Sequence, residues 1–266
     1  MNIKTIIYII IVAALASCTK VVEIDLNEAS PQIVMDAYVQ DYGEDWKFQK
    51  VNAKLTRSMS IYEDSAPEVF ENLEVYVTNE QGKRFKLDYN NQVFMYNILI
   101  DDVDRSTNWT IETNIEGNEI TSETSIPNYI AIDSIVAVKL PFGPRVDGLS
   151  PICFFTDIPG EANYFRLRIS INGIPMNSLF ITRDDGFDGQ QIAYPFMNTE
   201  AFVGDTLTIS LLAIDELSFE YYKVIMQNMG GGFSAAPGNP ITNIEGEGVI
   251  GVFTGQTISE VTRIIE

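Results

Sequence analysis

Apolar residues recur at every second position through much of this chain, and this alternation constrains its fold more than any other feature. Residues 51–55, 73–77 and 165–171 each place apolar side chains on one side of the chain and more polar ones on the other. A period of two is typical of β-strands with one buried and one wet face. We therefore expect a mainly β protein.

Turn residues join several of these strands into hairpins. Residues 79–82, with glycine at the last position, separate the strand at 73–77 from a second run at 85–89. Residues 116–118, with glycine in the middle, separate runs at 109–113 and 120–125. Glycine readily adopts the positive φ angle that tight hairpin turns require. Both segments therefore predict antiparallel hairpins.

Pro127 and Asn128 interrupt the alternation, and a new series of strands opens at Ile132. Residues near 128 are the best candidate for a domain boundary. We therefore predict two β-sandwich-like modules, residues 18–128 and residues 129–266, the first of immunoglobulin-like or fibronectin-like size. Beyond the N-terminal segment, only residues from about 216 to 229 have apolar side chains at helical spacing, which predicts one helix in the second module.

The N-terminus has the features of an export signal. Lys4 precedes an apolar run at 6–16, which ends in small residues before Cys18. This run is shorter than the roughly 20 apolar residues that a membrane-spanning helix needs. Residues 1–17 are therefore predicted to be a lipoprotein signal peptide, removed before Cys18. The mature chain would be attached to a membrane by lipid, such as palmitate, on Cys18.

Composition excludes several classes of chemistry. The chain contains no histidine, which removes Ser-His-Asp and Cys-His catalysis and the commonest zinc ligand. If Cys18 carries lipid, Cys153 is the one remaining thiol, and its apolar neighbours predict a core residue. The net charge of −20 repels phosphate backbones, so no nucleic-acid partner is expected. We expect the protein not to be an enzyme.

An acidic segment at 184–189 holds three carboxylates and two glycines, a composition that suits a calcium loop. The candidate ligands are Asp184, Asp185 and Asp188. Gly186 and Pro195 stand where an EF-hand needs oxygen ligands, so that motif is excluded. A calcium site of another kind and a plain acidic turn between strands both remain open. No other cofactor is expected. A hydrolase using Asp184 and Asp188 as a carboxylate pair is a third class of function.

Three aromatic residues are candidates for ligand contacts. Tyr42 and Trp46 lie in a polar segment after the first strand, and Phe233 lies in the glycine-rich segment 230–240. Aromatic side chains on long loops of β scaffolds can stack on a sugar or a partner's surface. The alternatives are that Trp46 starts a strand at the edge of the core and that 230–240 is a structural loop leading to the last strands.

Several segments of this chain occur in the same order as in a known protein family, and the chain resembles that family. The resemblance rests on the lipobox, which is the small-residue stretch 15–18 ending in Cys18, together with "PQIVMDAYV", "ENLEVYVTNEQGKRFKL", "ANYFRLRISING", "RDDGFDGQQ" and "GGGFSAAPGNPITNIEGEGVIGVFTG". This arrangement resembles domain of unknown function 4249, a family of Bacteroidota lipoproteins usually encoded beside a TonB-dependent outer-membrane receptor. The resemblance implies an outer-membrane location and a TonB-dependent transporter as partner, and it implies no enzymatic activity.

These observations together predict a non-enzymatic lipoprotein of the outer membrane. It would act in nutrient uptake as an accessory or substrate-capture partner of a TonB-dependent transporter. The alternative is a free-standing surface module that binds glycan or peptide through Tyr42, Trp46 and Phe233. The segment after Cys18 lacks the compact acidic run that resembles a surface-export signal, so the cell surface and the periplasmic face both stay open.

Overall fold

The computed structural model describes residues 30–43, 46–60, 63–101, 107–139, 148–197, 199–229, 238 and 240–266. The predicted signal peptide and Cys18 lie outside the described residues, and so does Phe233. Within the described ranges, no helix is long and apolar enough to cross a membrane. The unit described below runs from Pro31 to Glu266.

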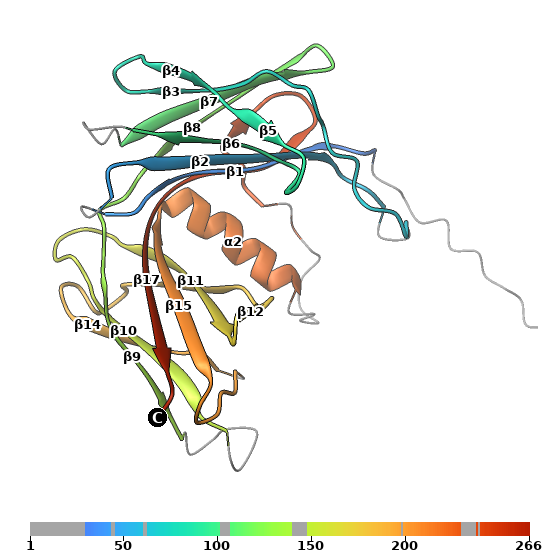
Figure 1. The fold of residues 1–266 in the computed structure, drawn as a ribbon. Coiled ribbons are helices and arrows are strands. Elements are labelled where there is room, and N and C mark those ends of the chain that lie inside the picture. Colours follow the sequence, from blue (N-terminus) through green and yellow to red (C-terminus); the bar gives the residue numbers. More distant parts are fainter. Residues whose placement is uncertain are drawn as a thin grey trace, which may run out of the picture. The chain divides into compact units, whose positions relative to one another are not determined.

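A nine-stranded sheet runs through this unit (Figure 1). Its strand order is β12-β11-β15-β17-β1-β2-β6-β5, with β13 also paired to β11. Neighbouring strands are antiparallel except for β1 and β17, which are parallel and pair Ile33 with Val249. The strands are β1 (Ile33–Asp41), β2 (Gln49–Arg57), β5 (Asp88–Asn90), β6 (Met95–Ile100), β11 (Tyr164–Ile171), β12 (Ile174–Pro175), β13 (Phe180–Arg183), β15 (Thr206–Ile214) and β17 (Val249–Ile264).

Two smaller sheets cover one face of the long sheet. The five-stranded sheet has the order β16-β8-β7-β3-β4 and the three-stranded sheet the order β14-β10-β9. The first encloses a core with β1, β2 and β6, and the second encloses a core with β11 and β15. Their strands are β3 (Val75–Asn79), β4 (Arg84–Lys86), β7 (Asn108–Ile115), β8 (Asn118–Ser125), β9 (Ile132–Val138), β10 (Ser150–Thr156), β14 (Gln191–Pro195) and β16 (Ile244–Glu245).

Strand β17 contributes to both cores. Phe253 is buried in the first core, whereas Val261 packs against the second. Because side chains alternate along a strand, their even spacing places both cores on the same face of the sheet. Gly251 allows close pairing with β1, since a Cβ there would lie 1.9 Å from the carbonyl oxygen of Met35.

The predicted boundary near residue 128 falls between Ile126 of the first core and Ile130 of the second. Nevertheless, Ile244, Val249 and Phe253, from the predicted second module, are buried in the first core. The C-terminal strands thus complete the N-terminal core. The division into two modules, 18–128 and 129–266, stays a prediction.

The predicted fold class is confirmed, because strands dominate the described residues and pack as sandwich-like layers. The β7–β8 hairpin turns at Glu116 and Gly117, with φ angles of 57° and 87°. One strand prediction is wrong: the run 85–89 is divided between two sheets. β4 pairs with β3, but β5 pairs with β6 in the long sheet. Between them the Leu87 side chain is buried in the first core, as the chain passes from one layer to the other.

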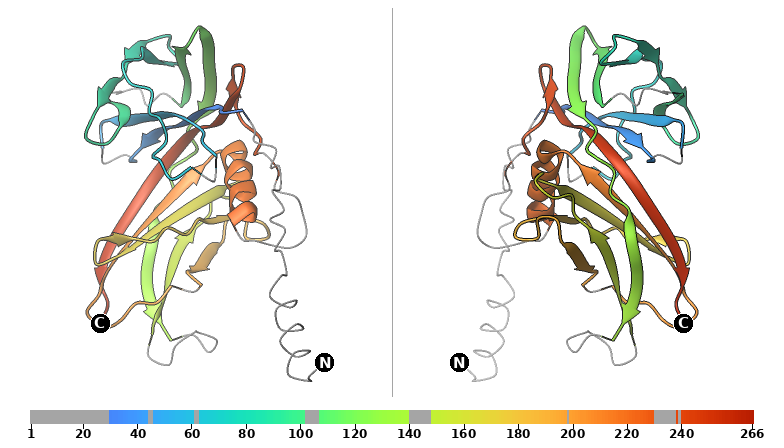
Figure 2. Two further views of the ribbon diagram at one scale, coloured as in Figure 1. Left: turned by 90° about the vertical axis from the view of Figure 1, so that its right-hand side faces the viewer. Right: turned by 90° about the vertical axis from the view of Figure 1, so that its left-hand side faces the viewer.

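Helix α2 (Glu216–Met229) has the predicted bounds. Asp215 caps it, because its Oδ1 accepts a hydrogen bond of 2.8 Å from the Ser218 backbone N–H. The helix buries Phe219 against Leu212 and Ile214. These two residues alternate along β15 with residues of the second core, so α2 lies on the opposite face of the long sheet. Figure 2 shows α2 beside β15 and beneath β1 and β2.

Candidate functional site

The face of the long sheet that carries α2 also carries a group of charged and aromatic side chains. Strands β1 and β2 contribute two cross-strand pairs, and β11 contributes two arginines at a spacing of two. Helix α2 adds two successive tyrosines. We call these eight residues the arginine–tyrosine cluster: Asp36 paired with Lys54, Tyr38 paired with Asn52, Arg166, Arg168, Tyr221 and Tyr222.

Curvature of the sheet brings β11 toward β1. Two strands lie between them, which corresponds to three strand spacings, or about 14 Å. Along the strands the two residues are also offset. Asp36 pairs with Val252 of β17. Arg166 pairs with Leu212 of β15, which in turn pairs with Ile258 of β17, six residues or about 20 Å beyond Val252. In a flat sheet, the Cα atoms of Asp36 and Arg166 would therefore be about 24 Å apart.

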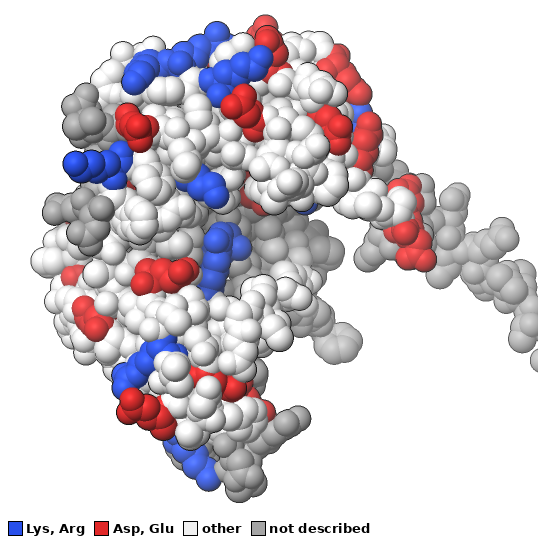
Figure 3. Space-filling model, viewed as in Figure 1, with Lys and Arg blue, Asp and Glu red and all other residues white. Residues whose placement is uncertain are grey.

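The charges are much closer than a flat sheet would allow. Arg166, Arg168 and Lys54 all lie near enough to the Asp36 carboxyl to oppose the rise in its pKa. Strand twist lets the sheet coil so that this face is concave. Figure 1 shows α2 in the angle between two parts of the long sheet, the β1–β2 part and the β11–β15 part. The surface is hollowed between these two parts (Figure 3).

Asp36 and Arg168 are both exposed, yet both lie in a partly desolvated environment. Burial by surrounding protein raises the pKa of the Asp36 carboxyl and lowers the pKa of the Arg168 guanidinium. Repulsion from Arg166 lowers the Arg168 pKa further. Water can reach these groups although protein atoms crowd them, which is the condition of a polar group inside a hollow.

Several side-chain donors of the cluster have no hydrogen-bond partner among the described residues. The Arg166 guanidinium stacks over the Tyr222 ring, 4.4 Å from its centroid, but no hydrogen bond or ion pair joins the side chain of Arg166, Arg168 or Lys54 to any described residue. Asn52 is 5% exposed, and its Nδ2 has no partner among the described residues. Its side chain lies beside the Tyr38 hydroxyl and opposes the rise in that pKa, but it makes no well-oriented hydrogen bond there.

The tyrosines of the cluster are neutral near pH 7. Burial raises the pKa of Tyr221 to about 12, and the neighbouring Asp36 carboxylate adds to the shift. Burial also raises the Tyr222 pKa, although Arg166 opposes this. Asp36 is the one carboxylate of the cluster. Glu260, on the same face, accepts a 2.7 Å hydrogen bond from Ser210 Oγ. This arrangement is suited to binding, since it offers donors and aromatic rings rather than a paired acid and base.

An aromatic triad adjoins the cluster. Tyr42, Trp46 and Phe48 have ring centroids 5.3–6.0 Å apart, and Trp46 is 53% exposed. Tyr42 lies close enough to Tyr38 to contribute to the rise in the Tyr38 pKa. The structure thus brings the predicted contacts Tyr42 and Trp46 together and adds Phe48. Phe233 lies outside the described residues.

The acidic segment 184–189 joins β13 to β14, and each of its carboxylates has a partner. Asp184 Oδ2 accepts a 3.0 Å hydrogen bond from the Asn163 N–H, and Asp188 Oδ1 accepts one of 2.6 Å from the Gly160 N–H. Asp185 forms an ion pair with Arg183. Within the described ranges, no three carboxylates or thiols lie close enough together to hold a metal ion. The calcium site and the carboxylate pair stay predictions without geometric support.

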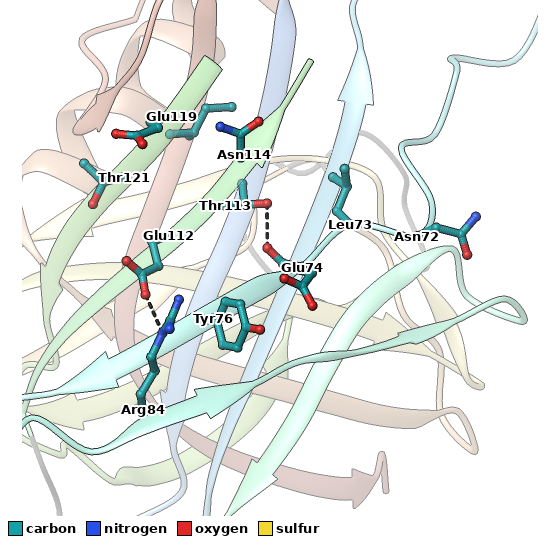
Figure 4. A pocket seen from close by; sticks show the side chains of 11 residues that line it. Asn72, Leu73, Glu74, Tyr76, Arg84, Glu112, Thr113, Asn114, Glu119 and Thr121 are labelled. Carbon is teal, nitrogen blue, oxygen red and sulfur yellow. Dashed lines mark hydrogen bonds and ion pairs between the residues drawn. The ribbon is translucent and has the colours of Figure 1, made fainter. Parts of the chain in front are cut away.

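A shallow pocket of about 520 Å³ lies on the outer face of the five-stranded sheet (Figure 4). Two of its carboxylates are paired with basic side chains. Arg84 forms a 2.6 Å ion pair with Glu112 and covers the Tyr76 ring at 3.7 Å, while Lys86 forms a 3.0 Å ion pair with Glu74. A ligand would have to displace these contacts. The arginine–tyrosine cluster is therefore the better candidate site.

The cluster combines residues that no sequence pattern associates. One signal was present: Arg166 and Arg168 share the polar face of a strand in a chain with 17 basic and 37 acidic residues. Cys153 is buried in the second core, and burial raises the pKa of its thiol to about 12. The prediction of a core thiol is confirmed.

Comparison with curated proteins finds no match. Among solved structures, the chain is similar to a DUF4785 family protein from Legionella pneumophila, with 11% sequence identity and a TM-score of 0.23. The similarity covers 67% of this chain and 51% of that one, so the chain spans about half the length of that protein. A family model described as domain of unknown function (DUF4249) matches residues 19–262, nearly the whole sequence after Cys18, and the chain therefore belongs to this family.

Proposed function

We propose that this protein is a non-enzymatic binding lipoprotein that captures a ligand in the hollow beside α2. The observation that carries the proposal is the set of side-chain donors in the arginine–tyrosine cluster that have no partner in the described part of the chain. Unpaired polar groups in a desolvated hollow are costly unless a ligand or water satisfies them. Their retention at an accessible position favours ligand binding over a purely structural role.

The capture role is proposed to serve a TonB-dependent transporter. The support is the lipobox before Cys18, which would hold the chain at the outer membrane, and the family to which the sequence belongs. In this arrangement the lipid anchor keeps the binding module at high local concentration beside its partner. The protein would act as an accessory or substrate-capture subunit in nutrient uptake.

Purification of the tagged protein from detergent-solubilised outer membranes tests this proposal. We expect a β-barrel receptor to co-purify in a fixed ratio and to remain through size-exclusion chromatography. The Cys18→Ser variant should lose radiolabelled palmitate and leave the membrane fraction. Persistent isolation of the wild-type protein, or unchanged fractionation of the variant, would contradict the partnership or the anchor respectively.

The aromatic triad favours a second candidate, a free-standing module that binds glycan or peptide. Exposed Trp46, packed against Tyr42 and Phe48, offers an aromatic surface on which a sugar ring could stack. A glycan and peptide array probed with the isolated protein separates the candidates. Binding without any co-purifying receptor favours the free-standing module, whereas a stable receptor complex favours the transporter partner.

A further inference from the structure

We propose that the arginine–tyrosine cluster binds a carboxylate group of a small organic anion. This inference rests on the proposed capture function and specifies its ligand class. Arg166, Arg168 and Lys54 bring three positive charges to one face, against two carboxylates, Asp36 in the cluster and Glu260, which is hydrogen-bonded to Ser210. The whole chain carries a net charge of −20, so a local excess of positive charge is a departure from its general surface. Such an excess inside a hollow attracts an anion.

Asp36 does not neutralise these cations. None of the three makes an ion pair with it, although five other basic side chains have acidic partners: Arg57, Arg84, Lys86, Arg183 and Lys223. Burial also raises the Asp36 pKa despite the three nearby positive charges. Asp36 is thus a weak counter-ion at a distance, and the guanidinium groups keep their hydrogen-bonding capacity for a ligand.

The two guanidinium groups and the Asn52 amide are donors whose side chains have no hydrogen-bond partner among the described residues. Each guanidinium has a planar fork of N–H groups that can bind a carboxylate through two parallel hydrogen bonds. The buried Asn52 Nδ2 adds an amide donor on the neighbouring strand. A ligand that satisfies this set must present acceptor oxygens, and an anionic oxygen pair matches the fork best.

Two features favour a carboxylate on a carbon skeleton over inorganic phosphate. Phosphate sites commonly use free backbone N–H groups at a helix N-terminus, but Asp215 already occupies that end of α2. The rings of Tyr221 and Tyr222 also line the cluster, and aromatic faces suit the apolar part of an organic ligand. An organic acid uses the cationic and the aromatic surface together.

D-galacturonate and D-galactose form a matched pair of probes, since they differ by a carboxylate in place of a hydroxymethyl group. Saturation-transfer NMR and calorimetry on the purified protein should detect galacturonate and glutarate at millimolar concentration, and galactose at least tenfold more weakly. Inorganic phosphate is the third probe. Equal binding of galactose, or binding of phosphate alone, would overturn the carboxylate assignment.

Substitutions of single basic residues test where on the protein the anion binds. Arg168→Gln should weaken galacturonate binding about tenfold or more, and Arg168→Lys should have an intermediate effect because it keeps the charge but loses the planar fork. Arg183→Gln removes a basic residue elsewhere and should leave binding unchanged. Melting temperatures show whether each variant is folded; Arg168→Lys replaces Arg168→Gln if the latter does not fold, and the double variant Arg166→Gln/Arg168→Gln should bind galacturonate more weakly than either single variant. Unchanged affinity in a folded double variant would refute the site.

The binding measurements use the purified protein alone, so their outcome does not depend on a transporter. If the protein never co-purifies with a receptor but binds galacturonate through Arg168, the transporter partnership fails and the carboxylate site stands. If a receptor complex forms but neither carboxylate probe binds, the ligand assignment fails and the partnership stands.

Discussion

Asp157 is a buried carboxylate whose folded environment disfavours its ionised form. It is 3% exposed, Gly189 N–H donates to its Oδ2, and its Oδ1 has no partner among the described residues. Desolvation raises its pKa, and the nearby Asp184 and Asp188 carboxylates add to the rise. Folding stability should therefore fall as the pH rises from below its unfolded pKa through its raised folded pKa.

Asp157→Asn should remove this cost. The variant amide can still accept from the Gly189 N–H, while its NH₂ group can donate toward the neighbouring carboxylates. We expect a gain of about 1 kcal/mol in the free energy of unfolding at pH 7, which disappears near pH 3 where the wild-type carboxyl is protonated. Urea unfolding at the two pH values measures this difference. A loss of stability at pH 7 would show that the ionised form is favoured.

Asp205 provides the control of opposite sign. Its two carboxylate oxygens accept hydrogen bonds of 2.8 Å from Asn172 Nδ2 and the Phe202 N–H, and these bonds lower its pKa. The stability that the ionised Asp205 carboxylate contributes to the fold is present above its unfolded pKa and is lost as the pH falls through its lowered folded pKa. Asp205→Asn should therefore destabilise the protein at pH 7 and have little effect at low pH, the reverse of the Asp157 variant.

At the scale of elements, Asp215 fixes the start of α2 and its attachment to the long sheet. One carboxylate oxygen accepts from the Ser218 N–H and the other from Ser218 Oγ, each at 2.8 Å. Ser218 Oγ also lies 3.0 Å from Thr254 Oγ1 on β17. Asp215 thus caps the helix and, through Ser218, helps to hold it on β17. This attachment helps to orient Tyr221 and Tyr222 toward the cluster.

Asp215→Ala should lower the free energy of unfolding by about 1–2 kcal/mol, as expected for loss of an N-cap. In this variant, amide hydrogen exchange should be accelerated relative to the wild-type protein more strongly across α2 than in β7 and β8. Asp215→Asn keeps a capping oxygen and should lose much less stability. If alanine and asparagine variants lost stability equally, the cap would not be the source of the effect.

Most elements could be predicted from the sequence because their signals are local. The alternation along β2, β11 and β15 and the helical spacing of 216–229 need no knowledge of distant residues. The cluster could not be predicted in this way, because Asp36 and Arg166 come near each other only through the order β1-β17-β15-β11 and the coiling of that sheet. The division of 85–89 between two sheets was likewise hidden, since Leu87 continues the alternation across the change of layer.

At the scale of the whole described unit, β17 connects the two cores. Its first part pairs with β1 and supplies Phe253 to the first core, while its later part pairs with β15 and packs Val261 into the second. Gly255 lies where β17 passes the end of β8, and a Cβ there would be 2.2 Å from the Ser125 carbonyl oxygen. The close approach leaves little freedom for the two parts to fold apart.

A chain comprising residues 30–128 should therefore not fold alone. It lacks β16 and β17, so Met35 and Ala37 would lose the strand that pairs beside them, and the core would lose Ile244, Val249 and Phe253. Truncating buried aliphatic and aromatic side chains typically costs about 2–5 kcal/mol each, and whole domains are stable by only about 5–15 kcal/mol. We expect poorly dispersed amide NMR signals and no cooperative unfolding transition.

Mixing this fragment with residues 129–266 provides the control, because the second fragment carries the missing strands. We expect the mixture to regain dispersed signals and a single unfolding transition, as strand β17 closes the first core. A dispersed spectrum and cooperative unfolding of residues 30–128 alone would instead establish the N-terminal module as autonomous. In that case the contribution of β17 to the first core would be an addition to a fold that is already complete.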